Sequence, residues 1–203
     1  MATLQLDPAT LNAMRQLLQG KNRKWATPGD MAQHLDPDTI QTPALQLIDQ
    51  TLIDTTNTTD GRAIITLPPQ EGKSQRVSRR YPLWTLTHNP NTRIAIVSYS
   101  HAVARRWGRT IRDDITTHPD LGLTIRPDLS AQHEWQLAEA QGGVYTTGIG
   151  GSLTGRPVDL LIIDDPIKDR EQADSTIYRN RVWDWWTDVA STRLAPGAPV
   201  ILI

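Results

Sequence analysis

The chain has 203 residues, a length that fits one domain with a small N-terminal appendage and a substantial core. Its formal charge of −1 gives the molecule as a whole no attraction for nucleic acid, so any such binding must come from a local patch. Cysteine is absent, which excludes disulfides and thiolate metal sites and fits a reducing interior. No apolar run resembles a signal peptide or is long enough to cross a bilayer, so we expect no membrane partner.

The first forty residues predict one short helix and an irregular connection. Asp7-Pro8 is typical of a helix start, because aspartate caps an N-terminus and proline is accepted in the first turn. The helix is expected to end at Gly20, and residues 21–38 are polar and interrupted by proline and glycine. We therefore assign residues 1–41 to a helix and connection that precede the main domain, residues 42–203.

A second helix and a first buried strand follow. Thr42-Pro43 begins the helix, and apolar residues recur in it with helical spacing at Leu45, Ile48, Leu52 and Ile53. Residues 55–61 are polar and predict a loop. The run from Arg62 to Leu67 then predicts the first strand of the core.

This strand stops at two prolines, and Gly72, Lys73 and Ser74 follow at the start of a predicted helix. A phosphate-binding loop needs backbone N–H groups around the β-phosphate, a lysine on the β and γ oxygens and a hydroxyl on Mg²⁺. These residues supply all of them at the positive end of a helix dipole. The full pattern is G-x-x-x-x-G-K-[ST], and Leu67 stands where its first glycine is expected. A Gly-Lys-Ser surface turn is the alternative interpretation.

The next predicted elements are a helix up to Trp84, a buried strand over Thr92–Ser98 and a helix capped by Ser100. The inner face of this last helix is predicted to consist of Val103, Trp107, Ile111 and Ile115. Its outer face carries the basic residues Arg105, Arg106, Arg109 and Arg112. They form either a solvated helix face or a patch that follows the phosphates of DNA.

Residues 118–141 predict irregular structure, and residues 142–149 predict a short strand or hairpin. The glycine-rich segment Gly148–Arg156 then leads directly into the next strand. Such a loop can move and lies close in sequence to that strand. Arg156 is therefore a candidate for sensing a γ-phosphate, in its own subunit or in a neighbour. The alternative is a surface arginine that helps the loop to close.

The strand after this loop contains four consecutive large aliphatic residues and ends in Asp164 and Asp165. This pattern is typical of a central parallel strand that is buried on both faces. Asp164 is placed to hold Mg²⁺ beside the Ser74 hydroxyl, and Asp165 is the candidate for orienting and deprotonating an attacking water. The two carboxylates could instead cap a loop, but the preceding lysine loop favours a nucleotide site.

Asp174 or Ser175 caps a last helix, and residues 199–203 predict one further core strand. Because a domain rarely ends inside such a strand, we expect the native chain to continue beyond Ile203. The order of elements predicts an α/β fold with a doubly wound, mostly parallel sheet flanked by helices. We expect an additional strand between the Lys73 strand and the Asp164 strand, and the sequence between these residues is long enough to supply it. Nucleotide should bind at the carboxyl ends of the strands.

Five motifs, in this order, resemble the ATPase domain of the large terminase subunit of tailed bacteriophages. They are Pro68–Ser74, Ser98–Ser100 with Ala104 and Arg105, Gly150–Arg156, Leu161–Pro166 with Lys168 and Asp169, and Thr192–Pro196. The resemblance covers residues 42–203. It implies a P-loop NTPase that hydrolyses ATP with Mg²⁺ and moves double-stranded viral DNA into a procapsid. The implied partners are the portal protein, the small terminase subunit and further copies in a ring, in the host cytoplasm at the portal vertex.

The resemblance also implies roles for single residues. Lys73 would hold phosphate, Ser74 and Asp164 would hold Mg²⁺, and Asp165 would serve the hydrolytic step. Nucleotide contacts are expected from Pro69, Gln70, Glu71, Gly72, Lys73, Ser74 and Gln75, with Gln46 near the adenine. Many relatives have an arginine in place of Gln70, and its role at the γ-phosphate would pass to Arg156, Arg79 or Arg80. The family's RNase H-like nuclease domain has no counterpart in these residues.

Two other functions are compatible with the motifs. A two-lobed P-loop helicase shares both nucleotide motifs, but it needs a second lobe. A non-enzymatic assembly module would bind nucleotide weakly and dock on portal or small-subunit partners. A nucleotide kinase is disfavoured, because the loop prolines and the end of the strand at Asp164-Asp165-Pro166 do not suggest an acceptor site and lid.

Overall fold

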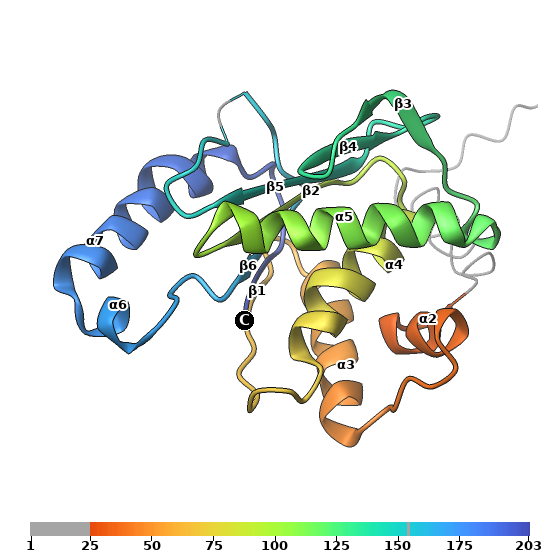
Figure 1. Ribbon diagram of the computed structural model, residues 1–203, viewed down its shortest axis with the longest axis horizontal. Coiled ribbons are helices and arrows are strands. Elements are labelled where there is room, and N and C mark those ends of the chain that lie inside the picture. The colour runs from red at the N-terminus through yellow and green to blue at the C-terminus, as the bar shows by residue number, and fades with distance from the viewer. Residues whose placement is uncertain (1–24, 154) are drawn as a thin grey trace, which may run out of the picture.

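A mixed, mostly parallel sheet forms the centre of the molecule in the computed structural model, which describes residues 25–153 and 155–203 (Figure 1). The seven strands lie in the order β1-β7-β6-β2-β5-β4-β3. Their bounds are β1 Arg62–Ile64, β2 Arg93–Ser98, β3 Ile125–Ser130, β4 Glu134–Leu137, β5 Gly143–Gly148, β6 Leu160–Asp164 and β7 Val200–Leu202. Among these strands, the pairs β3–β4 and β4–β5 are antiparallel and the others are parallel. The predicted α/β fold is confirmed.

A strand does separate the Lys73 strand from the Asp164 strand. It is β7, which pairs in parallel with β1 on one side and with β6 on the other. The predicted additional strand is therefore confirmed, but it does not come from the sequence between Lys73 and Asp164, where we expected it. Those residues supply β2 to β5 instead, which all lie beyond β6.

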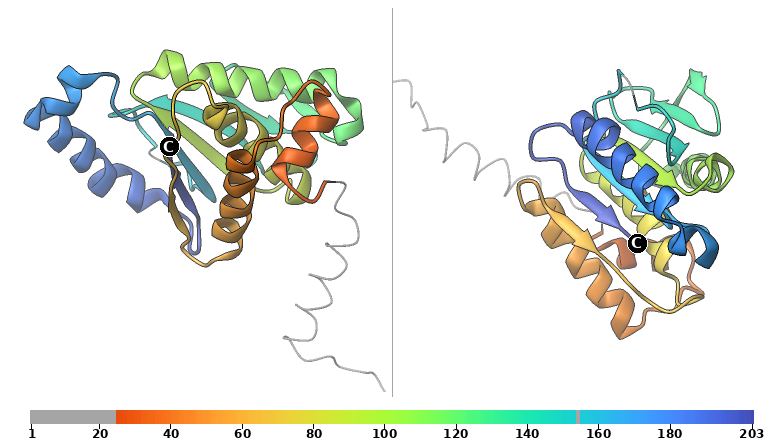
Figure 2. Two further views of the ribbon diagram at one scale, coloured as in Figure 1. Left: turned by 90° about the horizontal axis from the view of Figure 1, so that it is seen from below. Right: turned by 90° about the vertical axis from the view of Figure 1, so that its left-hand side faces the viewer.

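Helices cover the two faces of the sheet unequally. One face packs against α2 Pro28–Leu35, α3 Pro43–Asn57, the helix formed by η1 Gln75–Arg80 and α4 Tyr81–His88, and α5 His101–Thr117. The other face packs against α7 Thr176–Trp185 and its continuation η3 Trp186–Ala190. Short helical turns complete the chain at α6 Arg170–Asp174, η2 Pro119–Leu121 and η4 Ser191–Arg193. The left view of Figure 2 shows α7 well apart from α2 and α3.

The hydrophobic core consists of two clusters, one on each face of the sheet, because successive side chains of a strand point to opposite faces. Ile94 and Ile96 of β2 join the larger cluster under α3, α4 and α5, and Ala95 and Val97 join the smaller one under α7. Successive side chains of a strand point to opposite faces, so a strand that is apolar throughout must be covered on both. No helix among the described residues is long and apolar enough to cross a membrane.

Helix α2 corrects the predicted irregular connection of residues 21–38. Thr27 accepts a hydrogen bond from the Asp30 N–H, and Asp30 accepts one from the Thr27 N–H, which makes a capping box with Pro28 in the first turn. The proline and glycine that we took as interruptions therefore belong to a helix start. Met31 and Leu35 join the larger core cluster. The helix predicted from Asp7 to Gly20 lies outside the described residues.

The helix after the phosphate loop is confirmed, but its first part has an unexpected form. Gln75–Arg80 is a π-helix, and the α-helix α4 follows from Tyr81 to His88. Pro82 lies in the first turn of α4 rather than near the end of the helix. A proline in a helix lacks an N–H and clashes with the carbonyl four residues earlier, and the wider turn before it gives the proline ring more room.

The predicted inner face of α5 is confirmed at Ile111 and Ile115 but lies one residue off in the first half of the helix. The buried residues of α5 are Ala104, Gly108, Ile111, Asp114 and Ile115, whereas Val103 and Trp107 are half-buried. Gly108 explains the rotation, because a Cβ there would lie 2.8 Å from the Thr146 Cγ2 of β5. The helix therefore approaches the sheet through its smallest residue.

The predicted irregular segment, residues 118–141, is also wrong. It contains η2 and the antiparallel pair β3–β4, and residues 143–148 form β5, which pairs in parallel with β2. Trp135 and Leu137 alternate with half-buried residues on β4 in the usual pattern of a strand. Pro127 lies on β3, the edge strand, where a missing N–H is tolerated.

Candidate active site

The loop between β1 and η1 contains two residues with a left-handed backbone conformation. The Ile65 N–H donates to the Leu202 carbonyl, so the loop leaves the sheet beside β7. Gln70 and Gly72 then adopt left-handed conformations, with φ of 68° and 83°. Glycine adopts this conformation freely, but glutamine is strained in it, which is typical of functional loops. The Arg76 N–H donates to the Gly72 carbonyl at 3.0 Å, so the first helical turn begins on the loop itself.

Lys73 and Asp165 lie opposite one another at the carboxyl end of the sheet. Their Nζ and Oδ1 atoms are 3.9 Å apart, and the side chains are 19% and 61% exposed. Asp165 has a left-handed φ of 47°. Its N–H donates to the Ile203 carbonyl at the end of β7, and its carbonyl accepts from the Tyr99 N–H after β2. These bonds to strand ends on both sides hold the strained residue and leave its carboxylate open to solvent.

Ser74 and Asp164 form the buried part of the same site. The Ser74 hydroxyl donates to Asp164 Oδ1 at 3.1 Å, and Asp164 is only 2% exposed. Burial raises the pKa of Asp164 most, and the nearby charge of Asp165 raises it further, whereas Ser78, Ser74 and Trp107 oppose the shift. Residues from two distant segments therefore meet at one edge of the sheet, next to the C-terminus marked in Figure 1.

These side chains fit a magnesium ion that is shared with a nucleotide. A hydroxyl and a carboxylate provide the hard oxygen ligands that Mg²⁺ prefers. Within residues 25–153 and 155–203, no group of three or more His, Cys, Asp or Glu residues could hold a metal ion by itself. An ion at Ser74 and Asp164 would thus need further ligands from phosphates and water, which is the usual situation of Mg²⁺ in nucleotide sites.

The other predicted nucleotide contacts surround this edge. Of the loop residues, Pro69, Gln70, Glu71 and Gln75 are exposed. A Cβ on Gly72 would lie 3.7 Å from the Leu45 side chain, so the first turns of α3 lie beside the loop. Gln46 follows Leu45 and is exposed. The structure thus places Gln46 on a turn that borders the loop.

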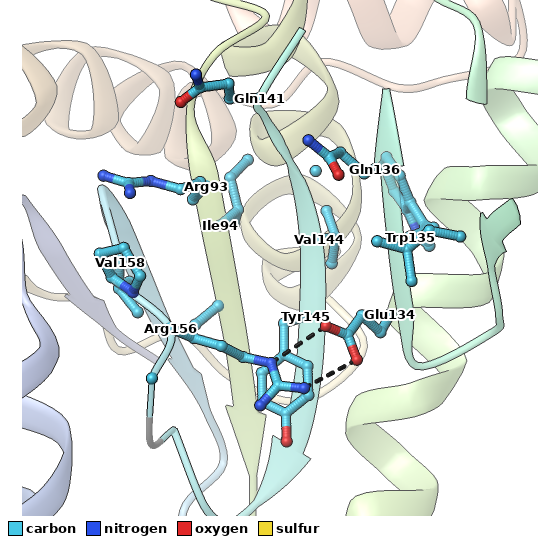
Figure 3. Close-up of a pocket in the computed structure, with 15 residues that line it drawn as sticks. Arg93, Ile94, Glu134, Trp135, Gln136, Gln141, Val144, Tyr145, Arg156 and Val158 are labelled. Atoms are coloured by element: carbon cyan, nitrogen blue, oxygen red, sulfur yellow. Dashed lines mark hydrogen bonds and ion pairs between the residues drawn. The ribbon is translucent and has the colours of Figure 1, made fainter. Parts of the chain in front are cut away.

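Arg156 does not join this group. Its guanidinium makes hydrogen bonds of 3.1 and 3.0 Å to the Glu134 carboxylate and lies 4.3 Å from the centre of the Tyr145 ring (Figure 3). These residues line a pocket over β2, β4 and β5. Within the described residues, Arg156 has no hydrogen bond or ion pair with Lys73, Asp164 or Asp165.

The other arginines considered for the γ-phosphate are also engaged. Arg79 donates to both oxygens of Asp114 on α5, at 2.8 and 2.7 Å, and Arg80 donates to Asp114 at 3.2 Å. Sequence reasoning missed Asp114 as their partner. It also missed Ser78 and Trp107 beside Asp164. The spacing of four residues from Ser74 was a usable signal for Ser78, because such residues share a helix face, whereas nothing in the sequence pointed to Trp107.

Comparisons with solved structures show which proteins share this fold. The HK97 bacteriophage large terminase superposes with a TM-score of 0.56 at 17% identity, over 81% of this chain and 33% of the HK97 chain. A mutant of the large terminase ATPase domain of Thermus phage P74-26 superposes with a TM-score of 0.51 at 13% identity, over 87% of this chain and 69% of that chain. No family model and no curated protein matches the sequence. The chain therefore has the fold of the Thermus phage large terminase ATPase domain and of about a third of the HK97 large terminase.

Proposed function

We propose that this chain is the ATPase domain of a phage large terminase subunit, which hydrolyses ATP to drive double-stranded DNA into a procapsid. The observation that carries the proposal is the meeting of Lys73 and Ser74 with Asp164 and Asp165 at one edge of the sheet. If Gly72–Ser74 were only a surface turn, or if the two aspartates only capped a loop, these four residues would not need to lie together. The fold shared with terminase ATPase domains supports the same interpretation.

Each residue of the site has a defined task in this proposal. The N–H groups of the loop up to Ser74 and the Lys73 ammonium bind the β and γ oxygens of the nucleotide. Ser74 and Asp164 hold Mg²⁺, which would neutralise charge that develops on these oxygens. Lys73 leaves Asp165 when phosphate attracts it. The freed Asp165 carboxylate, which is 61% exposed, then orients a water and accepts its proton.

Arg156 is proposed to reach the γ-phosphate of a neighbouring copy in a ring. Its binding to Glu134 and Tyr145, away from its own Lys73, favours the neighbour over its own subunit. A guanidinium that stabilises the transition state in trans would act only in the assembled ring. Arg156→Lys should then lower turnover in assembled rings and leave nucleotide affinity unchanged.

The outer face of α5 is the proposed contact for DNA. Arg105, Arg106 and Arg109 are exposed and form no ion pair with any described residue. Arg112 instead binds Asp113 and the Ser130 carbonyl. Partial burial lowers the pKa of His101, and its neighbours His133 and Arg105 lower it further. Portal protein, small terminase subunit and the host cytoplasm complete the proposed setting.

Steady-state ATP hydrolysis, measured with and without double-stranded DNA, tests the function. Lys73→Ala should remove nucleotide binding, whereas Asp165→Asn should retain binding and lose turnover about 100-fold or more. Stimulation by double-stranded DNA supports the motor, and nucleotide binding without turnover supports the assembly module. Turnover with strand separation supports the helicase. A fully active Asp165→Asn protein would contradict the role of Asp165.

Replacement of the α5 arginines tests the DNA contact separately. The test compares the wild-type chain with the triple variant Arg105→Ala, Arg106→Ala and Arg109→Ala. The slope of the logarithm of the DNA association constant against the logarithm of the salt concentration should be shallower in the variant. The slope should change by about one unit for each DNA phosphate that these arginines neutralise. Arg126→Ala is the control, because Arg126 binds Asp128 on β3 rather than standing unpaired. An unchanged slope in the triple variant would place the DNA elsewhere.

A further inference from the structure

The surroundings of Asp164 contain buried donors that the proposed chemistry does not yet use. The Ser78 hydroxyl, the Ser98 hydroxyl and the Trp107 ring N–H are all buried, and each lacks a hydrogen-bond partner among the described residues. An unmet buried donor costs about 1–3 kcal/mol, and native structures contain few of them. Three around one strand end therefore require an explanation.

Their positions show that they converge on Asp164 from three elements. Ser78 lies on η1 one turn after Ser74, and Trp107 lies on α5. Ser98 of β2 is paired in register with Asp164 of β6. Ile96 and Ile162, two residues before each of them, belong to the core cluster under the helices, so Ser98 and Asp164 point to that same face.

Two of these donors are close enough to Asp164 to act on its charge. Ser78 and Trp107 both lie beside the Asp164 carboxylate, although neither reaches it within normal hydrogen-bond limits in this structure. The hydrogen bond that is formed comes from Ser74. An ionised carboxylate offers about four acceptor positions, so Asp164 can take further donors while it keeps Ser74.

We infer that Ser78 and Trp107 are positioning residues, which donate hydrogen bonds to Asp164 and fix its carboxylate so that one oxygen faces Mg²⁺. This inference rests on the proposed function. A buried carboxylate that gives one oxygen to a metal needs donors for the other, because burial without them is costly. Partners behind a metal ligand commonly change metal affinity by 10–100-fold. The inference also gives α5 a contact with the metal site.

Nucleotide binding as a function of Mg²⁺ concentration tests this role without relying on turnover. A fluorescent ATP analogue is titrated into wild-type, Trp107→Phe and Ser78→Ala protein, first in EDTA and then at increasing Mg²⁺. We expect the nucleotide affinity in EDTA to be unchanged. The Mg²⁺ concentration at which the gain in nucleotide affinity is half complete, the Mg²⁺ midpoint, should be about tenfold higher in each variant. Phenylalanine keeps most of the ring packing and removes the N–H. Ser78→Thr restores the hydroxyl and should return the midpoint towards wild type.

Trp135→Phe is the matched control. Trp135 is a fully buried tryptophan of β4 that packs against α5, and its ring N–H donates to the Gly108 carbonyl at 2.8 Å. This variant should be less stable in urea and keep the wild-type Mg²⁺ midpoint. Midpoints within twofold of wild type in both Trp107→Phe and Ser78→Ala would overturn the inference. If Trp107→Phe does not fold, Ser78→Ala alone decides. A wild-type chain that binds no nucleotide would overturn the proposed function instead.

Discussion

Asp49 and Asp164 are equally buried, at 2% exposure each, yet their surroundings are opposite. Asp49 binds the Arg76 guanidinium and accepts a hydrogen bond from Gln41. Asp164 forms no ion pair with any described residue and has Asp165 as its charged neighbour. A buried carboxylate that pairs with a cation holds two secondary-structure elements together. A buried carboxylate without a cation costs stability, which makes it a candidate for a functional site.

The two buried acids that have cation partners, Asp49 and Asp114, both bind the helix that follows Ser74. Arg76 of η1 binds Asp49 of α3, and Arg79 and Arg80 bind Asp114 of α5. The helix that carries Lys73 and Ser74 is therefore fixed to its neighbours on both sides. This arrangement explains why Arg79 and Arg80 do not extend towards a phosphate. It also leaves Asp164 as a buried carboxylate that has no cation partner among the described residues.

Removal of a paired cation should have the largest effect on stability. Arg76→Met leaves Asp49 buried without its partner, and breaking such a pair costs about 3–5 kcal/mol. Urea unfolding measures this loss. The double variant Asp49→Leu and Arg76→Met removes both charges and should recover most of it. A loss below about 1 kcal/mol in the single variant would contradict a structural role for the pair.

Removal of the unpaired acid should have the opposite consequence. Asp164→Asn takes away a buried charge that has no cation, so the free energy of unfolding should stay constant or rise. The Mg²⁺-dependent gain in stability that a bound nucleotide gives the wild-type chain should disappear. This gain is about 2.7 kcal/mol when the ligand is at 100 times its dissociation constant. Thermal unfolding with and without Mg²⁺ and a non-hydrolysable ATP analogue measures both effects. A variant that keeps the gain would show that Asp164 holds no metal.

The sequence predicted those parts of the molecule that depend on local pattern. The aliphatic runs before Ser98 and Asp165 identified β2 and β6, because a central strand must be apolar on both faces. Helix α2 was missed because Pro28 and Gly29 read as a turn unless Thr27 and Asp30 are considered together as a capping box.

Tertiary partners were beyond the reach of such patterns. The pairing of Arg156 with Glu134 joins residues 22 apart, and that of Arg76 with Asp49 joins residues 27 apart. The rotation of α5 depends on how closely Gly108 approaches β5, which only packing decides. The same holds for Trp107, whose place beside Asp164 depends on how α5 packs against the sheet.

The smallest effect concerns the two ends of β6, where Asp159 precedes the strand and Asp164 ends it. Burial raises the pKa of Asp159, but hydrogen bonds from the Arg93 side chain and N–H outweigh it, so the pKa lies below its usual value. A lowered pKa means that the pair stabilises the fold above the unfolded value of about 3.9 and loses this contribution as the pH falls through the folded value. Arg93→Gln should therefore lower the free energy of unfolding by at most about 1 kcal/mol at neutral pH, because both side chains are partly exposed. Urea unfolding across pH 7 to about 3 should show the difference shrinking below about 3.9. A difference in unfolding free energy that persists unchanged into acid would mean that Arg93 stabilises the fold through packing. The charge pairing of Asp159 would then contribute nothing that distinguishes it from the unpaired Asp164.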